Sequence, residues 1–354
     1  TRRSLRRPVS FLVELTEPRQ VGIRSYPRPT ALDGDVLVRT LYSGISAGTE
    51  MTMYRGTTAY LDKQWDVARR LFIAGTPTHQ YPVDVWGYSE VGVVEETGRG
   101  VTSVASGDVV WGIWGHRSHA VLAEAVLRGH LMPDSVDPIV GTFDRVGAVA
   151  LNAVLDSGAR VGEIVAVFGQ GVIGLLATQL LNSMGCRVIA IDAMPDRLAL
   201  AARFGAQSLD PRDGDLALAV AQRFPSGVDR VIELSGSYAA LHQATRLAGP
   251  GGTVIAAGFY QGPATALVLG EEFHHNWVTI RCSQIGDVPP ELKGRWTRQR
   301  LHETVMQLCA ERRLDPAPLV THVIPAREAA RAYQLLEAPP ADLLQVILNF
   351  EADS

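Results

Sequence analysis

The stretch that decides the fold is a run of ten residues near the middle of the chain: Val165-Ala166-Val167-Phe168-Gly169-Gln170-Gly171-Val172-Ile173-Gly174. Its first four residues are apolar, which predicts the end of a buried strand. The three glycines then follow the spacing G-x-G-x-x-G. The first allows a tight turn, the second lets the backbone approach a pyrophosphate, and the third lets a helix pack closely on the sheet. Because a helix start also presents amide groups to phosphate charge, we predict that residues 169–174 bind a dinucleotide.

An acidic residue follows the next predicted strand at the spacing that such a site requires. The strand Arg187–Ile191 is followed by Asp192, close to the expected ~20 residues beyond Gly174. A carboxylate here accepts hydrogen bonds from ribose hydroxyls and repels a 2′-phosphate, so NAD is favoured. NADP remains an alternative because Arg197 can accommodate that phosphate. The structural interpretation, in which the glycines only make a turn and Asp192 caps a helix, is less favoured because all the parts occur together.

The sequence on either side of this motif predicts two domains. Apolar strands alternate with helical patterns over residues 155–283, which predicts a doubly wound parallel sheet. Residues 9–130 contain many short β-rich runs separated by turn residues, which predicts a barrel-like β domain. Within it, residues 51–86 form an aromatic-rich insertion in which 66–71 is predicted as a short helix. We assign 1–154 with 284–354 to the β domain because the apolar last strand, 344–350, should join a sheet.

Composition limits the classes of function. The chain has 354 residues, a formal net charge of −4 and 46% hydrophobic residues. That charge predicts no nucleic-acid or membrane partner, and no run of about 18 apolar residues is evident. The three cysteines, Cys186, Cys282 and Cys309, are far apart, which fits a reducing, cytoplasmic location. The first residues form either a basic arm or a solvated terminus, given their arginines Arg2, Arg3, Arg6 and Arg7.

Several further segments resemble the medium-chain dehydrogenase/reductase family over nearly the whole chain. They are Ser43-Gly44-Ile45-Ser46, Gly87-Tyr88-Ser89-Glu90-Val91-Gly92-Val93-Val94, Val149-Ala150-Leu151-Asn152-Ala153 and Gly251-Gly252-Thr253-Val254. The resemblance implies a GroES-like catalytic domain split around a Rossmann domain, an active site in the cleft between them, and a homodimer or homotetramer acting on a small-molecule substrate.

The positions that hold zinc in that family have changed. Zinc-dependent members read Gly-Ile-Cys and Gly-His-Glu, whereas this chain has Ser46 at the first position and Tyr88-Ser89 in the second motif. The third position aligns with Arg145, beside Asp144. Because zinc prefers thiolate, imidazole and carboxylate ligands, we expect no metal. The remaining candidate ligands have no clear ligand spacing: His79, His116, His119, His130, His274 and His275.

A narrower resemblance is to the zinc-free subset that contains bacteriochlorophyllide dehydrogenase. It rests on three segments, Ser43–Glu50, Ala257–Tyr260 and Val320–His322.

Candidate catalytic residues lie at or near the vacated zinc positions. Without zinc, hydrogen-bond donors must polarise a carbonyl or stabilise an alkoxide. Tyr88 is either such a donor or proton relay, or a packed aromatic residue. Ser46 is either a donor to the substrate or a small spacer. Arg145 binds a carboxylate or pairs with Glu50 or Asp144. Thr49 matches the family's hydroxyl relay if one residue is inserted, and Glu50 is a general acid or a structural partner.

The family resemblance also implies where the nicotinamide lies. The segment Gly258-Phe259-Tyr260 should pass the cofactor, and Ser235 should approach it from the end of the preceding strand. The aromatic residues of the insertion 51–86 either wall the substrate or pack in a core or interface.

These observations predict a zinc-independent, NAD(H)-dependent oxidoreductase that interconverts a secondary alcohol and a ketone of a specialised or sugar-like metabolite. One alternative is reduction of a conjugated C=C or C=N bond with NAD(P)H. A second is a non-catalytic dinucleotide-binding protein, which would bind cofactor without turnover.

Overall fold

The computed structural model describes residues 9–353 and divides into two compact units. Unit 1 comprises Thr1–Arg145 and Val320–Ser354, and unit 2 comprises Val146–Leu319. The four N-terminal arginines lie outside the described residues.

The unit boundaries differ from the predicted ones because residues 146–154 and 284–319 belong to unit 2. Asp315 N donates to Gln179 Oε1 at 2.7 Å, and Gln179 Nε2 donates to Asp315 O at 3.0 Å. Val305 lies so close to Gly147 that a Cβ at 147 would be 2.6 Å from Val305 Cγ1. These packing contacts join the segment to the dinucleotide unit.

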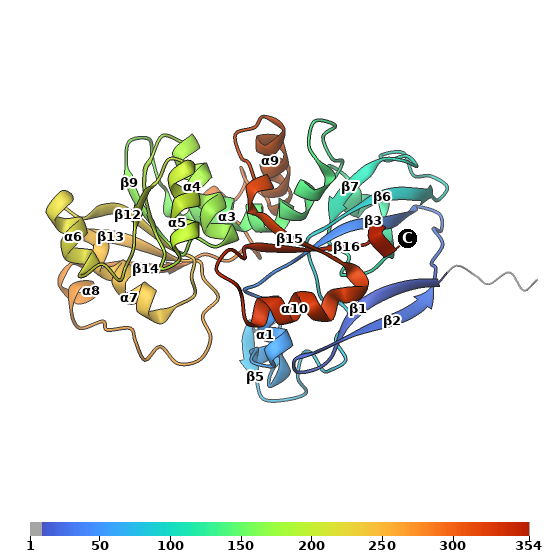
Figure 1. The fold of residues 1–354 in the computed structure, drawn as a ribbon, viewed down its shortest axis with the longest axis horizontal. Helices are drawn as coiled ribbons and strands as arrows, with labels where there is room; N and C mark the ends of the chain where they lie inside the picture. The colour runs from blue at the N-terminus through green and yellow to red at the C-terminus, as the bar shows by residue number, and fades with distance from the viewer. Residues whose placement is uncertain (1–8, 354) are drawn as a thin grey trace, which may run out of the picture. The chain divides into compact units, whose positions relative to one another are not determined.

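Unit 2 contains a six-stranded parallel sheet with strand order β11-β10-β9-β12-β13-β14. The strands are β9 (Ile164–Phe168), β10 (Arg187–Ile191), β11 (Gln207–Leu209), β12 (Val228–Glu233), β13 (Ala248–Ala256) and β14 (Thr279–Cys282). The helices are α3 (Asp144–Ser157, which begins in unit 1), α4 (Val172–Ser183), α5 (Pro195–Arg203), α6 (Leu216–Arg223), α7 (Tyr238–Leu247), α8 (Glu272–His275) and α9 (Arg298–Ala310), with 3-10 turns at Pro290–Leu292 and Ala317–Leu319. This architecture confirms the predicted doubly wound sheet (Figure 1). The strand order reverses between β9 and β12, where ligands bind in such folds.

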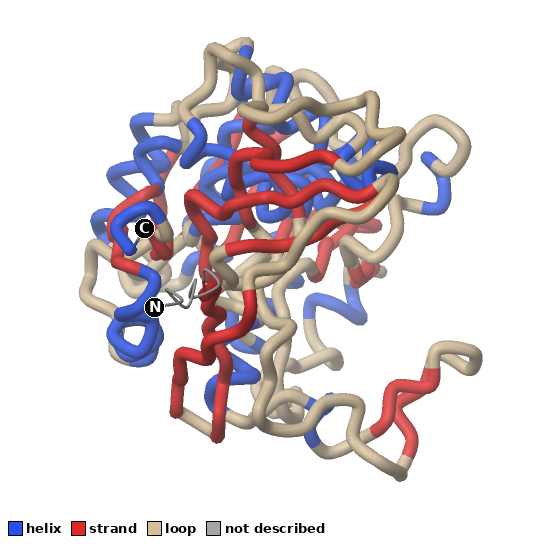
Figure 2. Tube along the Cα trace, turned by 90° about the vertical axis from the view of Figure 1, so that its right-hand side faces the viewer, coloured by secondary structure: helices blue, strands red, loops and turns tan. Residues whose placement is uncertain are grey.

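The regular secondary structure of unit 1 is mostly β-strand, and strands are drawn in red in Figure 2. Its main sheet has the order β15-β16-β3-β6-β7, and β8 also pairs with β3. The strands are β1 (Val9–Glu17), β2 (Gln20–Pro27), β3 (Asp35–Ile45), β4 (Gln64–Asp66), β5 (Leu71–Ile73), β6 (Glu90–Thr97), β7 (Val109–Gly112), β8 (His119–Ala123), β15 (Val320–Pro325) and β16 (Gln345–Asn349). The helices are α1 (Glu50–Arg55), α2 (Glu124–Leu127) and α10 (Ala329–Glu337), with 3-10 turns at Ala59–Leu61, Pro138–Phe143, Ala326–Glu328 and Glu351–Asp353. The last strand, β16, pairs with β3, so the prediction that it joins the first sheet is confirmed.

The predicted short helix at residues 66–71 is wrong. The antiparallel strands β4 and β5 pair there, joined by a four-residue turn. Asp66 accepts a hydrogen bond from Arg69 N at 2.8 Å, and Arg70 has φ +56°, a left-handed conformation that no α-helix continues through. The local turn therefore overrides the weak helical pattern.

The aromatic residues of the insertion pack mainly against one another. Phe72 lies 5.1 Å from Tyr60 and 4.9 Å from Trp65, measured between ring centroids. His79 lies 5.7 Å from both Tyr60 and Trp86. Such pairs stabilise the loop whatever its other role.

The helical stretch Pro138–Ser157 is long and apolar enough to cross a membrane, but 72% of its most apolar 18-residue window is buried. Buried core helices commonly have this length and composition.

Candidate active site

The glycine loop of unit 2 has the geometry that the sequence predicted. Gly169 follows β9 with φ +83°, and a Cβ there would lie 2.7 Å from the main-chain nitrogen of Ser235. A Cβ at Gly174 would lie 1.8 Å from Gly169 O, so only glycine permits this approach of helix α4 to the loop. At Gly171, the N-cap of α4, a Cβ would meet no atom within 4 Å. The open side of Gly171 is therefore the place where a pyrophosphate can approach the backbone.

The start of helix α4 supplies main-chain donors to this space. Leu175 N makes a hydrogen bond to Gly171 O at 2.9 Å, so the amides of Val172, Ile173 and Gly174 lie in the first turn, where helix amides point beyond the helix end. Gln170 contributes only its backbone here. Its side chain is fully buried and bonds Val167 O and the Thr178 hydroxyl, each at 3.0 Å.

Asp192 connects the glycine loop to the end of β10. Its Oδ2 accepts from Gln170 N at 2.6 Å, and its Oδ1 accepts from Met194 N at 2.8 Å. The Arg197 guanidinium lies 3.9 Å from Oδ2. The carboxylate thus orders the loop as well as standing where the ribose hydroxyls are expected, with a cation beside it.

Asp192→Asn is expected to reduce the preference for NADH over NADPH by about 10-fold in the ratio of the two Kd values, equivalent to ~1.4 kcal/mol. The substitution removes the charge that repels a 2′-phosphate while Arg197 remains. Fluorescence titration with NADH and NADPH measures the two affinities. A thermal unfolding midpoint near that of the wild type controls for loss of the bonds to Gln170 and Met194. An unchanged ratio in a folded variant would show that Asp192 does not select the cofactor.

A second cluster joins the ends of β12 and β13. The buried carboxylate of Glu233 accepts from Ser235 N at 2.8 Å, from the Ser235 hydroxyl, and from Gly236 N at 3.2 Å. It also accepts from the Tyr260 hydroxyl. Burial raises the pKa of Glu233, and burial together with the Glu233 charge raises the pKa of Tyr260.

The predicted nicotinamide segments therefore meet around a residue that the sequence prediction missed. A Cβ at Gly258 would lie 2.4 Å from Gly236 N, which shows how tightly the two loops approach. Phe259 is 48% exposed, unlike its neighbours. One feature of the sequence could have indicated Glu233 as a site residue: it is the last residue of an apolar strand, and Asp192 likewise follows an apolar strand.

The catalytic candidates of unit 1 lie together. Tyr88 precedes β6, Ser46 follows β3, and the Tyr88 hydroxyl donates to Ser46 Oγ. Burial raises the pKa of Tyr88, and the charge of Glu50 raises it further. Hydrogen bonds with Ser46 and Thr49 and the charge of Arg145 oppose this shift. Tyr88 is thus a neutral hydrogen-bond donor at physiological pH, and the four other predicted residues lie close enough to influence it.

Glu50 connects the residues of this cluster through its two carboxylate oxygens. It is fully buried and begins helix α1. Its Oε1 accepts from Ser46 N at 2.8 Å, and its Oε2 accepts from the Tyr333 hydroxyl at 2.9 Å. His116 Nε2 lies 2.8 Å from the same Oε2. This arrangement favours the role of Glu50 as a structural partner over that of a general acid.

Two more buried groups extend the network. His116 Nδ1 lies 2.6 Å from Ser43 Oγ, which donates to Glu90 Oε1 at 2.9 Å. Glu90 Oε2 accepts from Trp114 N at 2.7 Å and from Gly115 N at 3.2 Å. Burial raises the pKa of Glu90. Sequence reasoning considered His116 only as a metal ligand and assigned Glu90 no role.

The residues at the former zinc positions do not fit zinc. A hydroxyl, a phenol and a guanidinium replace the thiolate and imidazole ligands that zinc prefers. Both nitrogens of His116, an imidazole of the same cluster, already face Ser43 and Glu50. Within residues 9–353, no group of three or more His, Cys, Asp or Glu side chains is placed to hold a metal ion.

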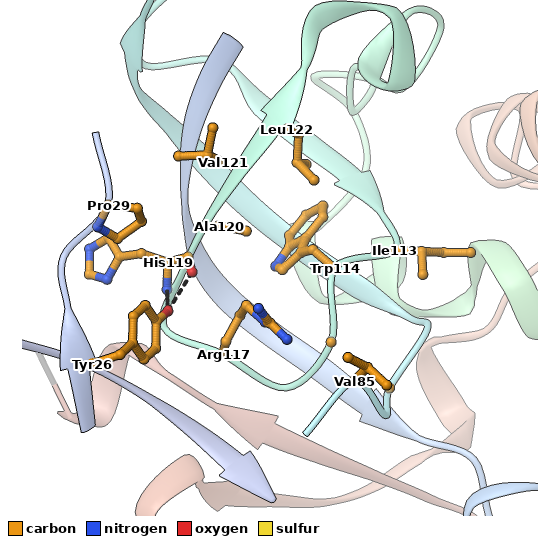
Figure 3. Close-up of a pocket in the computed structure, with 12 residues that line it drawn as sticks. Tyr26, Pro29, Val85, Ile113, Trp114, Arg117, His119, Ala120, Val121 and Leu122 are labelled. Carbon is orange, nitrogen blue, oxygen red and sulfur yellow. Dashed lines mark hydrogen bonds between the residues drawn. The ribbon is translucent and has the colours of Figure 1, made fainter. Parts of the chain in front are cut away.

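A groove of about 420 Å³ lies in unit 1 beside this network (Figure 3). Its walls are mostly apolar and include Val85, Ile113, Trp114 and Leu122. Gly87 forms part of the wall, and a Cβ there would lie 2.9 Å from the His116 ring. Gly87 therefore lines the groove and also packs against the His116 ring of the network.

Comparisons with known proteins agree with the fold of both units. The family described as zinc-binding dehydrogenase matches residues 172–299. The chain is 29% identical over 345 residues to D-guloside 3-dehydrogenase of Escherichia coli K12, covering 95% of this chain and 98% of that protein. The structure of 2R,3R-butanediol dehydrogenase from Bacillus subtilis has a TM-score of 0.78 and 22% identity, covering 96% and 99% of the two chains. A short chain alcohol dehydrogenase from Escherichia coli CFT073, complexed with NADH, has a TM-score of 0.78 and 20% identity, covering 97% and 99%.

The two units have the α/β architecture of the solved medium-chain dehydrogenase structures, with a glycine loop after the first strand of the parallel sheet. More closely, the chain is an NAD(P)-dependent medium-chain dehydrogenase, and residues 172–299 are similar to the family described as zinc-binding dehydrogenase. The predicted enzyme class is confirmed, and the interpretation as a non-catalytic dinucleotide-binding protein is set aside.

Proposed function

We propose that the protein is an NAD(H)-dependent dehydrogenase that interconverts a secondary alcohol and a ketone on a sugar-like, polyhydroxylated small molecule, without zinc. The observation that carries the proposal is the hydrogen bond from Tyr88 to Ser46 at the positions where the family resemblance places zinc ligands. The 29% identical relative is named for dehydrogenation of a D-guloside, which supports a sugar-like substrate.

In this proposal, the residues of the polar cluster donate hydrogen bonds and a proton to the substrate oxygen, as zinc would otherwise polarise it. When bound, the dinucleotide accepts or supplies the hydride. In the reducing direction, the Ser46 hydroxyl donates its proton to the carbonyl oxygen as the alcohol forms, and Tyr88 reprotonates Ser46 through their hydrogen bond. Solvent then returns a proton to Tyr88. In the oxidising direction the same relay runs in reverse: the substrate hydroxyl proton passes to Ser46, the Ser46 proton to Tyr88 and the Tyr88 proton to solvent, while these groups stabilise the developing alkoxide. The positive charge of Arg145 opposes the rise in the pKa of Tyr88 and favours an anionic substrate oxygen.

The residues of unit 2 fit the dinucleotide. The amides at the start of α4 would receive the pyrophosphate, Asp192 the ribose hydroxyls, and the loops around Glu233 the nicotinamide. We extend the proposal to a cytoplasmic homodimer or homotetramer. The narrower resemblance to bacteriochlorophyllide dehydrogenase stays a prediction.

The test is nicotinamide absorbance at 340 nm with chelator-treated protein and a panel of substrates. Alkyl D-gulosides, other secondary alcohols, ketones and enones are compared with NAD and NADP. We expect turnover of a sugar-like alcohol with NAD, and activity unchanged by chelation. A zinc-dependent alcohol dehydrogenase treated in parallel should lose activity. Loss of activity restored by zinc would refute zinc independence, and turnover of enones alone would instead indicate a C=C reductase.

A further inference from the structure

His116 is a buried imidazole at the centre of the unit 1 network. The residue is 2% exposed and lies on the loop between β7 and β8. Its two nitrogens connect separate elements: Nε2 faces Glu50 of α1 at 2.8 Å, and Nδ1 faces Ser43 of β3 at 2.6 Å. Neither contact reaches the Tyr88–Ser46 pair directly.

We propose that His116 is a positioning residue for the Tyr88–Ser46 pair and acts on it through Glu50. The role of the pair as proton donor rests on the proposed function, whereas the coupling between His116 and Tyr88 is a property of unit 1 alone. Glu50 is the link because it holds Ser46 N with one carboxylate oxygen and His116 with the other.

Charge compensation is the first reason for this assignment. A carboxylate that is fully buried is costly unless it is hydrogen-bonded and paired. The other donors to Glu50, Ser46 N and the Tyr333 hydroxyl, are neutral. His116 is thus a hydrogen-bonded partner of Glu50 that can carry a positive charge.

The groups around His116 favour its charged form. Burial lowers the pKa of His116, but the charges of Glu50 and Glu90 and the hydrogen bond to Glu50 outweigh it, so the pKa is raised. The charge of Arg117 acts in the opposite direction. Ser43 and Tyr333 complete the surroundings as neutral hydroxyl groups.

The electrostatic effect on Tyr88 is the second reason. After burial, the charge of Glu50 is the largest influence that raises the pKa of Tyr88. An imidazolium beside Glu50 offsets part of that charge, and the same contact fixes the carboxylate that holds the Ser46 backbone. Losing His116 would therefore change both the position of Ser46 and the electrostatic field at the phenol.

The fold leaves this imidazole little room to move. Gly87, with φ +100°, lies against the ring, and a Cβ there would be 2.9 Å from both His116 Cε1 and Nδ1. Gly87 directly precedes Tyr88, so the backbone that packs on His116 also carries the phenol. The ring and the phenol are thus coupled by packing as well as through Glu50.

The test uses two substitutions of His116, one that can keep the contact with Glu50 and one that can keep the contact with Ser43. In His116→Gln, the amide can still donate to Glu50, near the position of Nε2. In His116→Asn, the shorter amide reaches the Ser43 side, near the position of Nδ1, and leaves Glu50 without this partner. The full-length protein is labelled with tyrosine carrying ¹³C at Cζ, and Tyr88→Phe identifies the Tyr88 signal.

We expect His116→Asn to shift the Tyr88 signal most, and His116→Gln, which keeps the hydrogen bond to Glu50 but not the positive charge, to shift it by a smaller amount. Thermal unfolding checks that both variants fold. A Tyr88 signal that is unmoved in a folded His116→Asn variant, or moved equally by both substitutions, would overturn the proposal. If His116→Asn does not fold, a second measurement decides: the pKa of His116 is followed from its imidazole ¹⁵N signals in the wild type and in Glu50→Gln. The proposal requires the pKa of His116 to fall in Glu50→Gln, and an unchanged pKa refutes it.

An activity measurement separates this proposal from the proposed function. With a turned-over alcohol, His116→Asn should lower kcat by about 10-fold with little change in KM, and His116→Gln should recover the part of the loss that depends on the hydrogen bond to Glu50. If the wild type turns over no alcohol while the Tyr88 signal still shifts as expected, the coupling stands and the proposed function fails. If alcohols are turned over but the Tyr88 signal does not shift, the proposed function stands and the coupling between His116 and Tyr88 fails.

Discussion

Tyr88→Phe is expected to lower kcat for alcohol–ketone interconversion by about 10²–10³-fold, within the range for loss of one positioned proton donor. The phenol donates directly to Ser46 Oγ, and its raised pKa keeps it protonated. Phenylalanine keeps the ring in place but removes the donor. The measurement is steady-state kinetics with NAD and the best alcohol of the substrate panel.

Two further variants make this result specific. Tyr42→Phe removes a phenol hydroxyl that bonds Glu351 in an exposed contact, and it should leave kcat unchanged. Ser46→Ala should cost about as much as Tyr88→Phe, and the double variant should cost little more because the two hydroxyls act as one unit. Full activity in a folded Tyr88→Phe variant would remove the phenol from the mechanism. A rise in KM alone would assign it to substrate binding.

Gly174→Ala is expected to destabilise unit 2 by roughly 3 kcal/mol, the upper end of the overpacking range, and to abolish NADH binding. The new Cβ would lie 1.8 Å from Gly169 O, a main-chain atom that cannot rotate away. Helix α4 must therefore move away from the glycine loop. Thermal unfolding and NADH fluorescence titration measure the two effects.

Gly171→Ala is the matched control, because it separates folding from binding. Gly171 has φ −73°, and its Cβ would meet no protein atom within 4 Å. We expect wild-type stability but an NADH affinity at least about 10-fold weaker, since the methyl group enters the space proposed for the pyrophosphate. Wild-type NADH affinity in Gly171→Ala would place the pyrophosphate elsewhere. Wild-type stability in Gly174→Ala would contradict the close packing of α4.

Some site residues were predictable only in part. The sequence placed Gln170 in the dinucleotide loop, but its side chain faces Val167 and Thr178 in the interior. It placed Glu50 near the chemistry, but not between Ser46, His116 and Tyr333. The contacts of Glu50 with His116 and Tyr333 span 66 and 283 residues, and no local window of sequence contains them.

The sequence by itself determined the parallel sheet, the glycine loop and the acid after β10, because a strand, a turn and a helix start are specified by neighbouring residues. It also determined that the last strand returns to the first unit, since so apolar a strand must join a sheet. Only the tertiary structure decided that residues 284–319 pack in unit 2 and that residues 66–71 turn between two strands. It alone brought Glu233 to Tyr260 and His116 to Glu50. Those contacts depend on how separate elements pack, and packing is a property of the whole folded unit.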